Sequence, residues 1–349
     1  MSAAGPLLTI AIPTYNRAGY LRKNIAQLHS ELRDLPDGLV ELIVSDNCSP
    51  DETPRVVEDA IAGGLNIRYV RNEKNLGWGP NFAQSYEMAS GKFVLLFSDD
   101  DLLLDGSVKE LICRLSQADY GVVVLGAYGY DDDFRAEYPG NHGREFEFTE
   151  SNAFFKKVGP RITLTSACVI NKSVIPGKSL TAYANGDLAS LPLVLSAAIA
   201  AQRNLLITRY MIAVKRLNSS NYDYAKAFVQ ELWSTYEDHA GPGLTSGTIR
   251  SIQRSMLRSF YPFYAFQFRY TQRDGLESMQ RHFTERFRGY PAYWFWIAPT
   301  LYLPRPAAVA WGAATMAVGR IMGGELRRGV AFAMSKAKSA VKKKLTLST

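Results

Sequence analysis

The sequence predicts an α/β fold with a mostly parallel sheet, flanking helices and an additional C-terminal helical region. Short apolar runs alternate with segments of helical periodicity at a spacing of roughly 30 residues, which is the pattern of βαβ units. Several of these runs end in polar residues that could bind a ligand. The chain has 349 residues, of which 47% are hydrophobic, so it can bury the core of one large domain with appendages or of two domains.

Apolar runs typical of buried strands recur through the first part of the chain, at residues 7–12, 40–44, 67–70, 93–97 and 122–125. Helical periodicity and start signals predict four helices. The first runs through 24–32 and could be capped by Thr14, and the second has Thr53 as its cap and Pro54 as its first residue. The others lie at 81–89 and after Asp105 and Gly106. Further along, residues 163–170 and 205–214 are candidate strands, and Leu191–Ala200 is an apolar helix.

Polar residues stand where three of the predicted strands end. Residues 14–17 follow the first strand, residues 45–47 follow the second, and residues 98–101 follow the fourth. Because ligands of open α/β sheets bind at the carboxyl ends of the strands, we expect these stretches to form one site. The chain has neither a GxGxxG nor a GxxxxGK[ST] motif, so a nucleotide would be held mostly by side chains and a metal ion.

Three consecutive carboxylates, Asp99, Asp100 and Asp101, follow the run 93–97. Adjacent carboxylates repel one another, and a hard divalent cation that bridges to phosphate oxygens would compensate them. The alternative interpretation is a solvated acidic turn that closes a strand. The three cysteines are widely spaced and form neither a disulfide framework nor a zinc site, which favours reduced thiols in the cytosol.

Five segments taken together resemble glycosyltransferase family 2. They are AIPTYNR, IVSDNCSPDET, RNEKNLGWGPNF, ASGKF and LLFSDDDLL, and they occur in the family's order. The forms SDN-x-S-x-D and LLFSDDD are similar to those of abequosyltransferase-like enzymes of bacterial surface polysaccharide assembly. The resemblance covers residues 7–125 well and 160–220 loosely. It implies a GT-A fold and the transfer of a sugar from a nucleotide sugar with inversion at the anomeric carbon.

The resemblance also implies a nucleotide-binding set. The ring of Tyr15 would lie near the base, Asp46 would contact the edge of the base, and Asn47 stands where many relatives have a second aspartate. The Asn-x-Gly element of the family falls on Asn75 and Gly77. The donor nucleotide would be bound by Pro13, Thr14, Tyr15, Arg17, Asp46, Asn47, Asn75, Gly77, Asn81, Ser98 and Asp99.

The metal motif of the family places its first aspartate on Ser98 and its metal-binding aspartate on Asp100, and a shift by one residue gives Asp99-x-Asp101 instead. We expect Asp100 to bind Mg²⁺ or Mn²⁺ directly, Asp101 to belong to the same metal site, and Asp99 to lie near the ribose. Inversion requires a general base. The resemblance points to Asp187, although Gly186 stands where relatives usually have a glutamate. The alternative is an aspartate that merely favours a helix N-terminus.

Positive charge is concentrated in the C-terminal part of the chain. Residues 273–349 contain 13 basic and 4 acidic residues, whereas the residues before them carry a net charge of −2. From residue 290 the chain is rich in aromatics and interrupted by prolines, and its apolar run 307–318 is too short to span a membrane. Residues 327–344 have the pattern of a basic amphipathic helix, which predicts binding to an anionic membrane surface. The alternative is a tail that packs on the catalytic domain or on a second subunit.

These observations predict a glycosyltransferase domain at 1–225, with a donor half at about 7–125 and an acceptor half at about 126–225. They also predict a helical linker region at 226–289 and a membrane-associating tail at 290–349.

We expect an inverting, metal-dependent hexosyl- or deoxyhexosyltransferase. Its partners would be a nucleotide sugar and a lipid-linked glycan acceptor of O-antigen, capsule or lipopolysaccharide assembly. It would be peripheral on the cytoplasmic side of the inner membrane, since the N-terminal residues lack the features of a signal peptide. No nucleic acid is expected, and a homo-oligomer is possible. The alternatives are a nucleotidyltransferase and an inactive membrane-associated scaffold with the same fold.

Overall fold

The structure is a computed structural model that describes residues 5–181, 184, 186–216 and 223–322. The chain divides into two compact units. Unit 1 comprises Met1–Phe134, Asn141–Asn221 and Glu231–Thr248, and unit 2 comprises Arg135–Gly140, Tyr222–Gln230 and Ile249–Thr349. The predicted basic amphipathic segment 327–344 lies outside the described residues.

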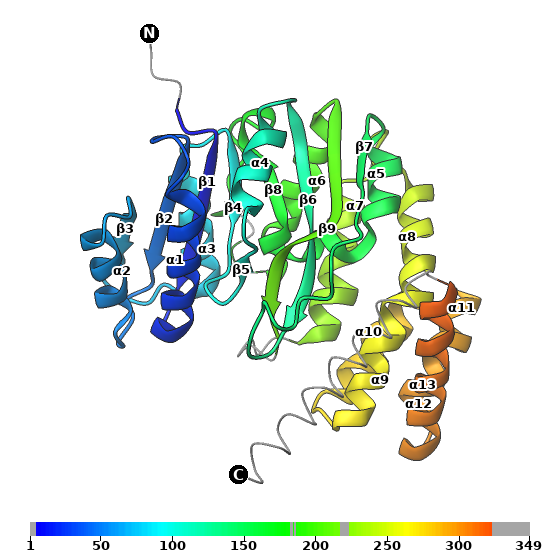
Figure 1. Cartoon of the computed structure of the whole chain (residues 1–349). Coiled ribbons are helices and arrows are strands. Elements are labelled where there is room, and N and C mark those ends of the chain that lie inside the picture. Colours follow the sequence, from blue (N-terminus) through cyan, green and yellow to red (C-terminus); the bar gives the residue numbers. More distant parts are fainter. Residues whose placement is uncertain (1–4, 182–183, 185, 217–222, 323–349) are drawn as a thin grey trace. The chain divides into compact units, whose positions relative to one another are not determined.

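Unit 1 is built on a sheet with the strand order β3-β2-β1-β4-β8-β6-β9-β5, and β7 also pairs with β9 (Figure 1). The strands are β1 (Leu8–Thr14), β2 (Val40–Asp46), β3 (Arg68–Arg71), β4 (Phe93–Leu96), β5 (Leu102–Leu103), β6 (Tyr120–Tyr130), β7 (Glu145–Phe148), β8 (Cys168–Asn171) and β9 (Arg203–Lys215). The strands β3, β2, β1 and β4 are mutually parallel. Strand β8 then runs antiparallel to both β4 and β6, and β9 is antiparallel to β5 and β7. Strands β6 and β9 pair in parallel. The sheet is therefore mixed: parallel pairing, as expected, joins β3, β2, β1 and β4 and also β6 and β9, whereas β8, β5 and β7 run antiparallel to their neighbours.

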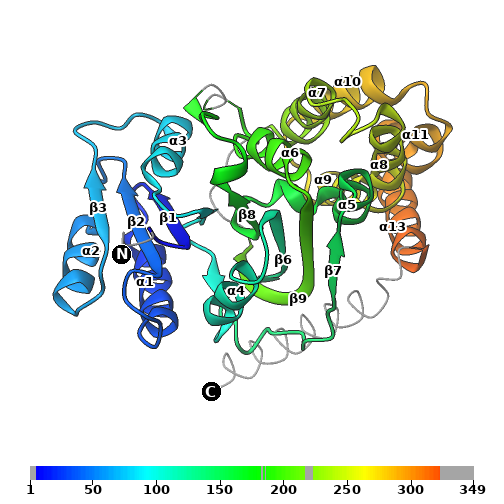
Figure 2. The ribbon, with the colours of Figure 1, turned by 90° about the horizontal axis from the view of Figure 1, so that it is seen from above.

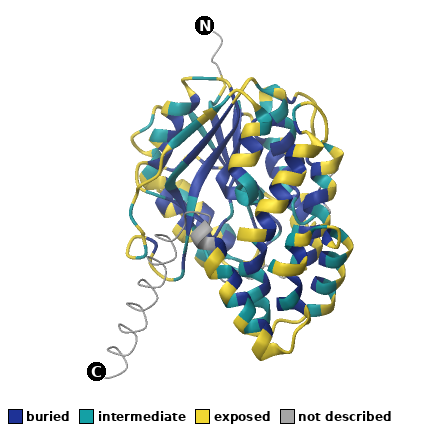
Figure 3. Ribbon diagram, turned by 90° about the vertical axis from the view of Figure 1, so that its right-hand side faces the viewer, coloured by how far each residue is buried: buried dark blue, intermediate teal, exposed yellow. Residues whose placement is uncertain are grey.

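Helices cover both faces of the sheet, as Figure 2 shows for α1 (Ala18–Leu32) and α2 (Thr53–Ala62) on one side and α3 (Trp78–Met88) and α6 (Leu191–Ala200) on the other. Helix α3 packs on β1, β2 and β4, and α6 packs on β6 and β8. The remaining helices of unit 1 include α4 (Ser107–Leu115), α5 (Ser151–Val158) and α7 (Leu232–Asp238). Strand β4 is buried along its whole length, which agrees with its unbroken apolar run. Figure 3 shows much of the sheet in the dark blue of buried residues.

Three local expectations need correction. Helix α1 begins at Ala18, and its cap position is Arg17, because Thr14 belongs to β1. The main-chain N–H of Ala18 instead donates to the Asp51 carboxylate across 2.9 Å. The candidate strand at 163–170 is shorter than predicted, since the 3₁₀ turns η1 (Gly159–Thr163) and η2 (Thr165–Ala167) precede β8. Thr53 is the first residue of α2 rather than its cap.

Unit 2 is helical and has an aromatic core. Its helices are α8 (Ser246–Ser259), α9 (Tyr261–Thr271), α10 (Leu276–Phe287), α11 (Pro291–Trp296), α12 (Ala298–Tyr302) and α13 (Arg305–Met322). Tyr261 is buried with its ring centroid 5.0 Å from that of Phe283 and 5.7 Å from that of Phe287. Helix α13 packs on α9. In the described part of the chain, no helix combines the length and apolarity needed to cross a bilayer.

Candidate functional site

The carboxyl ends of β1, β2 and β4 meet at one edge of the sheet. Thr14 lies opposite Asp46 in the parallel register, and Ala11 lies opposite Leu96. The main-chain N–H of Asn47 donates to the carbonyl of Thr14 across 2.9 Å. The structure therefore brings together the three polar stretches that the sequence analysis grouped into one site.

The three aspartates that follow β4 are buried, with exposed fractions of 2–3%. Asp99 accepts hydrogen bonds from the hydroxyl of Thr14 at 2.7 Å and from Nη1 of Arg17 at 2.6 Å. The second guanidinium nitrogen of Arg17, Nη2, donates to Asp100 across 2.9 Å. Arg17, which the resemblance placed in the nucleotide pocket, is thus an ion-pair partner of two of the aspartates.

Asp101 is held by two residues that come later in the sequence of unit 1. Its carboxylate accepts from the main-chain N–H of Lys215 at 3.1 Å, at the end of β9, and from the hydroxyl of Ser166 in η2. The Ser166 hydroxyl also accepts from the main-chain N–H of Ser98. Ser98, the position of the family's first metal-motif aspartate, is therefore tied to the same short turn.

Two further side chains hold the main chain of the aspartate turn. The amide of Asn24 donates to the carbonyl of Asp101 at 2.8 Å, and the hydroxyl of Tyr130 donates to the carbonyl of Asp100 at 3.1 Å. The sequence analysis missed both residues, together with Ser166 and Lys215. Asn24 carried a usable signal, because it lies on the face of its helix that also presents Leu21 and Leu28 to the core. The others come from distant segments and have no local signature.

Burial dominates the electrostatics of these carboxylates. Desolvation and, to a lesser degree, the charge of the nearby Asp100 raise the pKa of Asp101 to about 7. Desolvation also raises the pKa of Asp99 to about 6, although the charge of Arg17 opposes that rise. Burial by itself would lower the pKa of Arg17, but the two carboxylates raise it above its ordinary value. One guanidinium therefore compensates only part of the negative charge of the turn.

The loop between β3 and α3 is locked by a network of asparagine side chains, of which Asn47 and Asn81 are buried. The side-chain NH₂ of Asn47 donates to Oδ1 of Asn75 at 2.8 Å and to the carbonyl of Gly77 at 2.9 Å. Its Oδ1 accepts from Asn72 and from the main-chain N–H of Leu76. Asn47 uses both ends of its amide for this loop, and an aspartate could supply only the acceptor end.

Asn81, on α3, continues the same network to β2. Its side-chain NH₂ donates to the carbonyl of Ser45, and its Oδ1 accepts from the Ser45 hydroxyl at 2.7 Å. Asn72 also donates to Oδ1 of Asn81 at 3.1 Å. The predicted nucleotide residues Asn47, Asn75, Gly77 and Asn81 are thus neighbours, and their described contacts fix the shape of the loop.

Asp46 and Tyr15 have contrasting environments. Asp46 is fully buried, and its carboxylate accepts from the main-chain N–H of Ser49 at 2.9 Å and from the hydroxyl of Tyr69 at 2.8 Å, with Nε of Arg71 at 3.4 Å. The ring of Tyr15 is 41% exposed at the sheet edge. Pro13, the remaining predicted residue, pairs with Ser45 in the sheet.

Asp187 lies in the turn that precedes α6. Its main-chain N–H donates to a carboxylate oxygen of Glu231 at 2.8 Å. The turn is connected to the aspartates indirectly, because the hydroxyls of Ser190 and Thr165 are 2.9 Å apart and Thr165 precedes Ser166. Among the described residues, no hydrogen bond joins the Asp187 carboxylate to the three aspartates.

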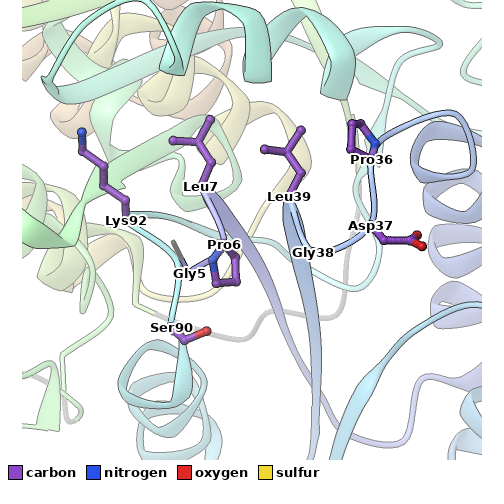
Figure 4. A pocket seen from close by; sticks show the side chains of 9 residues that line it. All are labelled: Gly5, Pro6, Leu7, Pro36, Asp37, Gly38, Leu39, Ser90 and Lys92. Atoms are coloured by element: carbon purple, nitrogen blue, oxygen red, sulfur yellow. The ribbon is translucent and has the colours of Figure 1, made fainter. Parts of the chain in front are cut away.

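A surface pocket lies at the opposite edge of the sheet (Figure 4). It is lined by residues that precede β1, β2 and β4, among them Pro6, Gly38 and Ser90. Because ligands of such sheets bind at the carboxyl ends of the strands, this pocket is not the candidate site.

The comparisons with known proteins match the part of the chain that contains the three strand ends. Residues 9–175 match the family described as Glycosyl transferase family 2. The chain is 35% identical over 114 residues to GalNAc(5)-diNAcBac-PP-undecaprenol beta-1,3-glucosyltransferase of Campylobacter jejuni, a match that covers 32% of this chain and 35% of that protein. It is 36% identical over 116 residues to Abequosyltransferase RfbV of Salmonella typhimurium, covering 32% of this chain and 34% of that protein. The match spans about a third of the length of these curated relatives.

The fold is similar to that of a solved structure, residues 1–349 of S. aureus TarS in complex with UDP-GlcNAc. The TM-score is 0.60 over 91% of this chain and 92% of that chain, with 17% sequence identity. A likeness at this identity establishes the fold alone, which is a mixed α/β, GT-A-like arrangement of a central sheet with flanking helices. The comparisons therefore indicate a glycosyltransferase, in which residues 9–175, just under half of the chain, match glycosyl transferase family 2.

Proposed function

We propose that this chain is an inverting glycosyltransferase that moves a sugar from a nucleotide sugar to a saccharide acceptor. One observation carries the proposal. Three buried aspartates lie at the carboxyl edge of the sheet, beside the β1 and β2 ends and inside the matched family domain. The relatives reported above support sugar transfer, and the TarS complex supports a nucleotide sugar as the donor class.

The donor would bind across the ends of β1 and β2. The exposed ring of Tyr15 offers a flat apolar surface for a base, and the loop locked by Asn47, Asn75, Gly77 and Asn81 gives the pocket a fixed wall. Asp46 would contact the edge of the base directly. It would also orient Tyr69, which donates a hydrogen bond to it, and Arg71, its ion-pair partner, toward the base.

The aspartate turn fits a divalent cation. Three carboxylates are buried together and one guanidinium compensates them, so a hard dication would complete the neutralisation. In the described residues, no three His, Cys, Asp or Glu side chains are arranged to hold a metal by themselves, so the other ligands would be phosphate oxygens and water. Asp100, with Asp101 beside it, would hold Mg²⁺ or Mn²⁺. When bound, such an ion stabilises the negative charge of a departing diphosphate.

Asp187 would act as the general base. Its carboxylate would take the proton of the acceptor hydroxyl, whose oxygen attacks the anomeric carbon. The bond from that carbon to the diphosphate breaks, and its electron pair leaves with the diphosphate oxygen. Because attack and departure occur on opposite faces, the configuration inverts. Glu231 fixes the main chain of Asp187 and so orients the turn.

The acceptor would be a lipid-linked glycan, and the protein would be peripheral on the cytoplasmic side of the inner membrane. In unit 2 the side chains of Trp294, Phe295 and Tyr302 are more than half exposed. Exposed aromatic residues of this kind favour a membrane interface. The aromatic and basic region 290–349 would form the membrane-binding part, with 1–225 as the transferase and 226–289 as a linker.

The donor assignment is tested by screening nucleotide sugars with Mn²⁺ and measuring sugar transfer. Asp100→Ala should abolish metal-dependent donor binding, and unchanged transfer would refute the metal assignment. Asp187→Asn should abolish transfer with donor binding intact, and an active variant would exclude it as the base.

The membrane assignment is tested with vesicles that contain anionic lipid. The double variant Trp294→Ser with Phe295→Ser should bind them more weakly than the wild type. Ile61→Ser, which changes an exposed residue of unit 1, serves as the matched control. Equal binding by all three proteins would contradict a role of Trp294 and Phe295 in membrane binding.

A further inference from the structure

Arg17 bridges two adjacent carboxylates. Its Nη1 lies 2.6 Å from Oδ1 of Asp99, and its Nη2 lies 2.9 Å from Oδ2 of Asp100. The side chains of these aspartates are 3% and 1% exposed, whereas that of Arg17 is 23% exposed. The guanidinium is therefore more accessible to solvent than the two carboxylates that it contacts.

The position of this guanidinium is determined by several contacts. It lies over the ring of Tyr20, 5.1 Å from the ring centroid, and Arg17 occupies the residue directly before helix α1. The other oxygen of Asp99 is taken by the hydroxyl of Thr14. Thus three oxygens of the Asp99–Asp100 pair already accept hydrogen bonds from protein donors.

A divalent cation at Asp100 would share that carboxylate with Arg17, whose Nη2 contacts its Oδ2. Two cations that share one carboxylate repel each other, and the low exposure of the aspartates limits the screening of that repulsion by water. Without either cation, three adjacent carboxylates would be buried with no compensating charge.

We propose that Arg17 is the resident counter-ion of Asp99 and Asp100 and competes with the divalent cation for them. This inference rests on the proposed metal site. Arg17 keeps the metal-free protein folded, and it weakens metal binding until a diphosphate supplies further negative charge. Arg17 thereby has a second role in the donor pocket, because its guanidinium sets the affinity of the metal site.

The test is direct titration with Mn²⁺ alone, monitored through the electron paramagnetic resonance signal of the free ion. Arg17→Gln removes the charge and should bind Mn²⁺ about tenfold more tightly than the wild type, the scale on which one nearby charge alters ion binding. Arg22→Gln is the matched control, because Arg22 lies on the same helix in an exposed pair with Glu52. The control should leave the Mn²⁺ affinity unchanged.

Thermal unfolding of the chelator-treated proteins supplies a second readout. Without metal, Arg17→Gln should lower the thermal unfolding midpoint more than Arg22→Gln does. Addition of Mn²⁺ should raise the unfolding midpoint of Arg17→Gln more than that of the wild type. If Arg17→Gln does not fold, Arg17→Lys replaces it, since lysine cannot span both carboxylates with a planar fork. The lysine variant keeps the charge but can contact only one of the carboxylates closely, so it should bind Mn²⁺ more tightly than the wild type by less than tenfold.

Equal or weaker Mn²⁺ binding by the Arg17 variant would overturn the competition. If Asp100→Ala still abolishes Mn²⁺ binding in that case, the metal site of the proposed function stands and only the role of Arg17 is wrong. If neither the wild type nor the Arg17 variant binds Mn²⁺ alone, this inference is overturned, and the metal site of the proposed function is then decided separately by the metal dependence of donor binding.

Discussion

Replacing Gly79 by alanine should separate the helix on which it lies from the turn that leads to Asp187. Gly79 is the second residue of α3, directly after the locked loop. A Cβ atom at this position would lie 1.5 Å from the carbonyl oxygen of Ala184 and 2.6 Å from its carbonyl carbon. Both of the obstructing atoms belong to main chain, so no side-chain rotation relieves the clash.

The size of the effect follows from that geometry. Ordinary contact begins near 3.4 Å, so one of the two segments must move by about 2 Å. Overpacking of this kind costs about 1–3 kcal/mol. Alanine has a better helix propensity than glycine, which offsets about 0.5–1 kcal/mol of this loss of stability. If the Ala184 segment moves, Asp187 moves with it, and a displacement of this size can lower a catalytic rate by about 100-fold.

Gly19 supplies the matched control, because it is also the second residue of its helix and a Cβ atom added to it would have no other atom within 4 Å. Gly19→Ala should be as stable as the wild type or more so, with full transfer activity. Gly79→Ala should lose activity, stability or both, as measured by sugar transfer and by chemical unfolding. A Gly79→Ala protein that matches Gly19→Ala in both assays would refute the packing of this turn on α3.

Asn47→Asp should destabilise the protein by about 2 kcal/mol and weaken nucleotide-sugar binding in calorimetry, because a carboxylate would face the carbonyl of Gly77 instead of donating to it. Wild-type affinity would show that the network is dispensable. Burial raises the pKa of Glu41, but hydrogen bonds, the largest from Thr9, more than offset this and lower it. Its carboxylate therefore stabilises the folded state at neutral pH and loses that effect as the pH falls through its pKa. Glu41→Gln should cost about 1 kcal/mol at pH 7 and less near pH 4 in unfolding experiments, and a pH-independent cost would contradict this. Tyr130→Phe should lower stability by about 1 kcal/mol and weaken Mn²⁺ binding, since it frees the main chain of the middle aspartate; unaltered binding would argue against that support.

The candidate site could be located from sequence because its parts follow strands of a simple parallel pattern. Strand β1 pairs in parallel with both β2 and β4, and the register of these pairs brings the three carboxyl ends together. The supporting residues could not be found in this way. Ser166 and Lys215 reach Asp101 from segments that lie more than sixty residues away, and their contacts depend on how β8 and β9 insert into the sheet.

The sequence by itself determined the strand–helix alternation of the first 125 residues, the polar strand ends and the family motifs, since each of these is written in local spacing. The tertiary structure alone decided that the sheet is mixed, because antiparallel pairing of β8 with β4 and β6 depends on contacts between distant segments. It also decided what compensates the aspartates within the protein. Only folding places Arg17, some eighty residues earlier in the chain, across two carboxylates that must lose their hydration when they are buried.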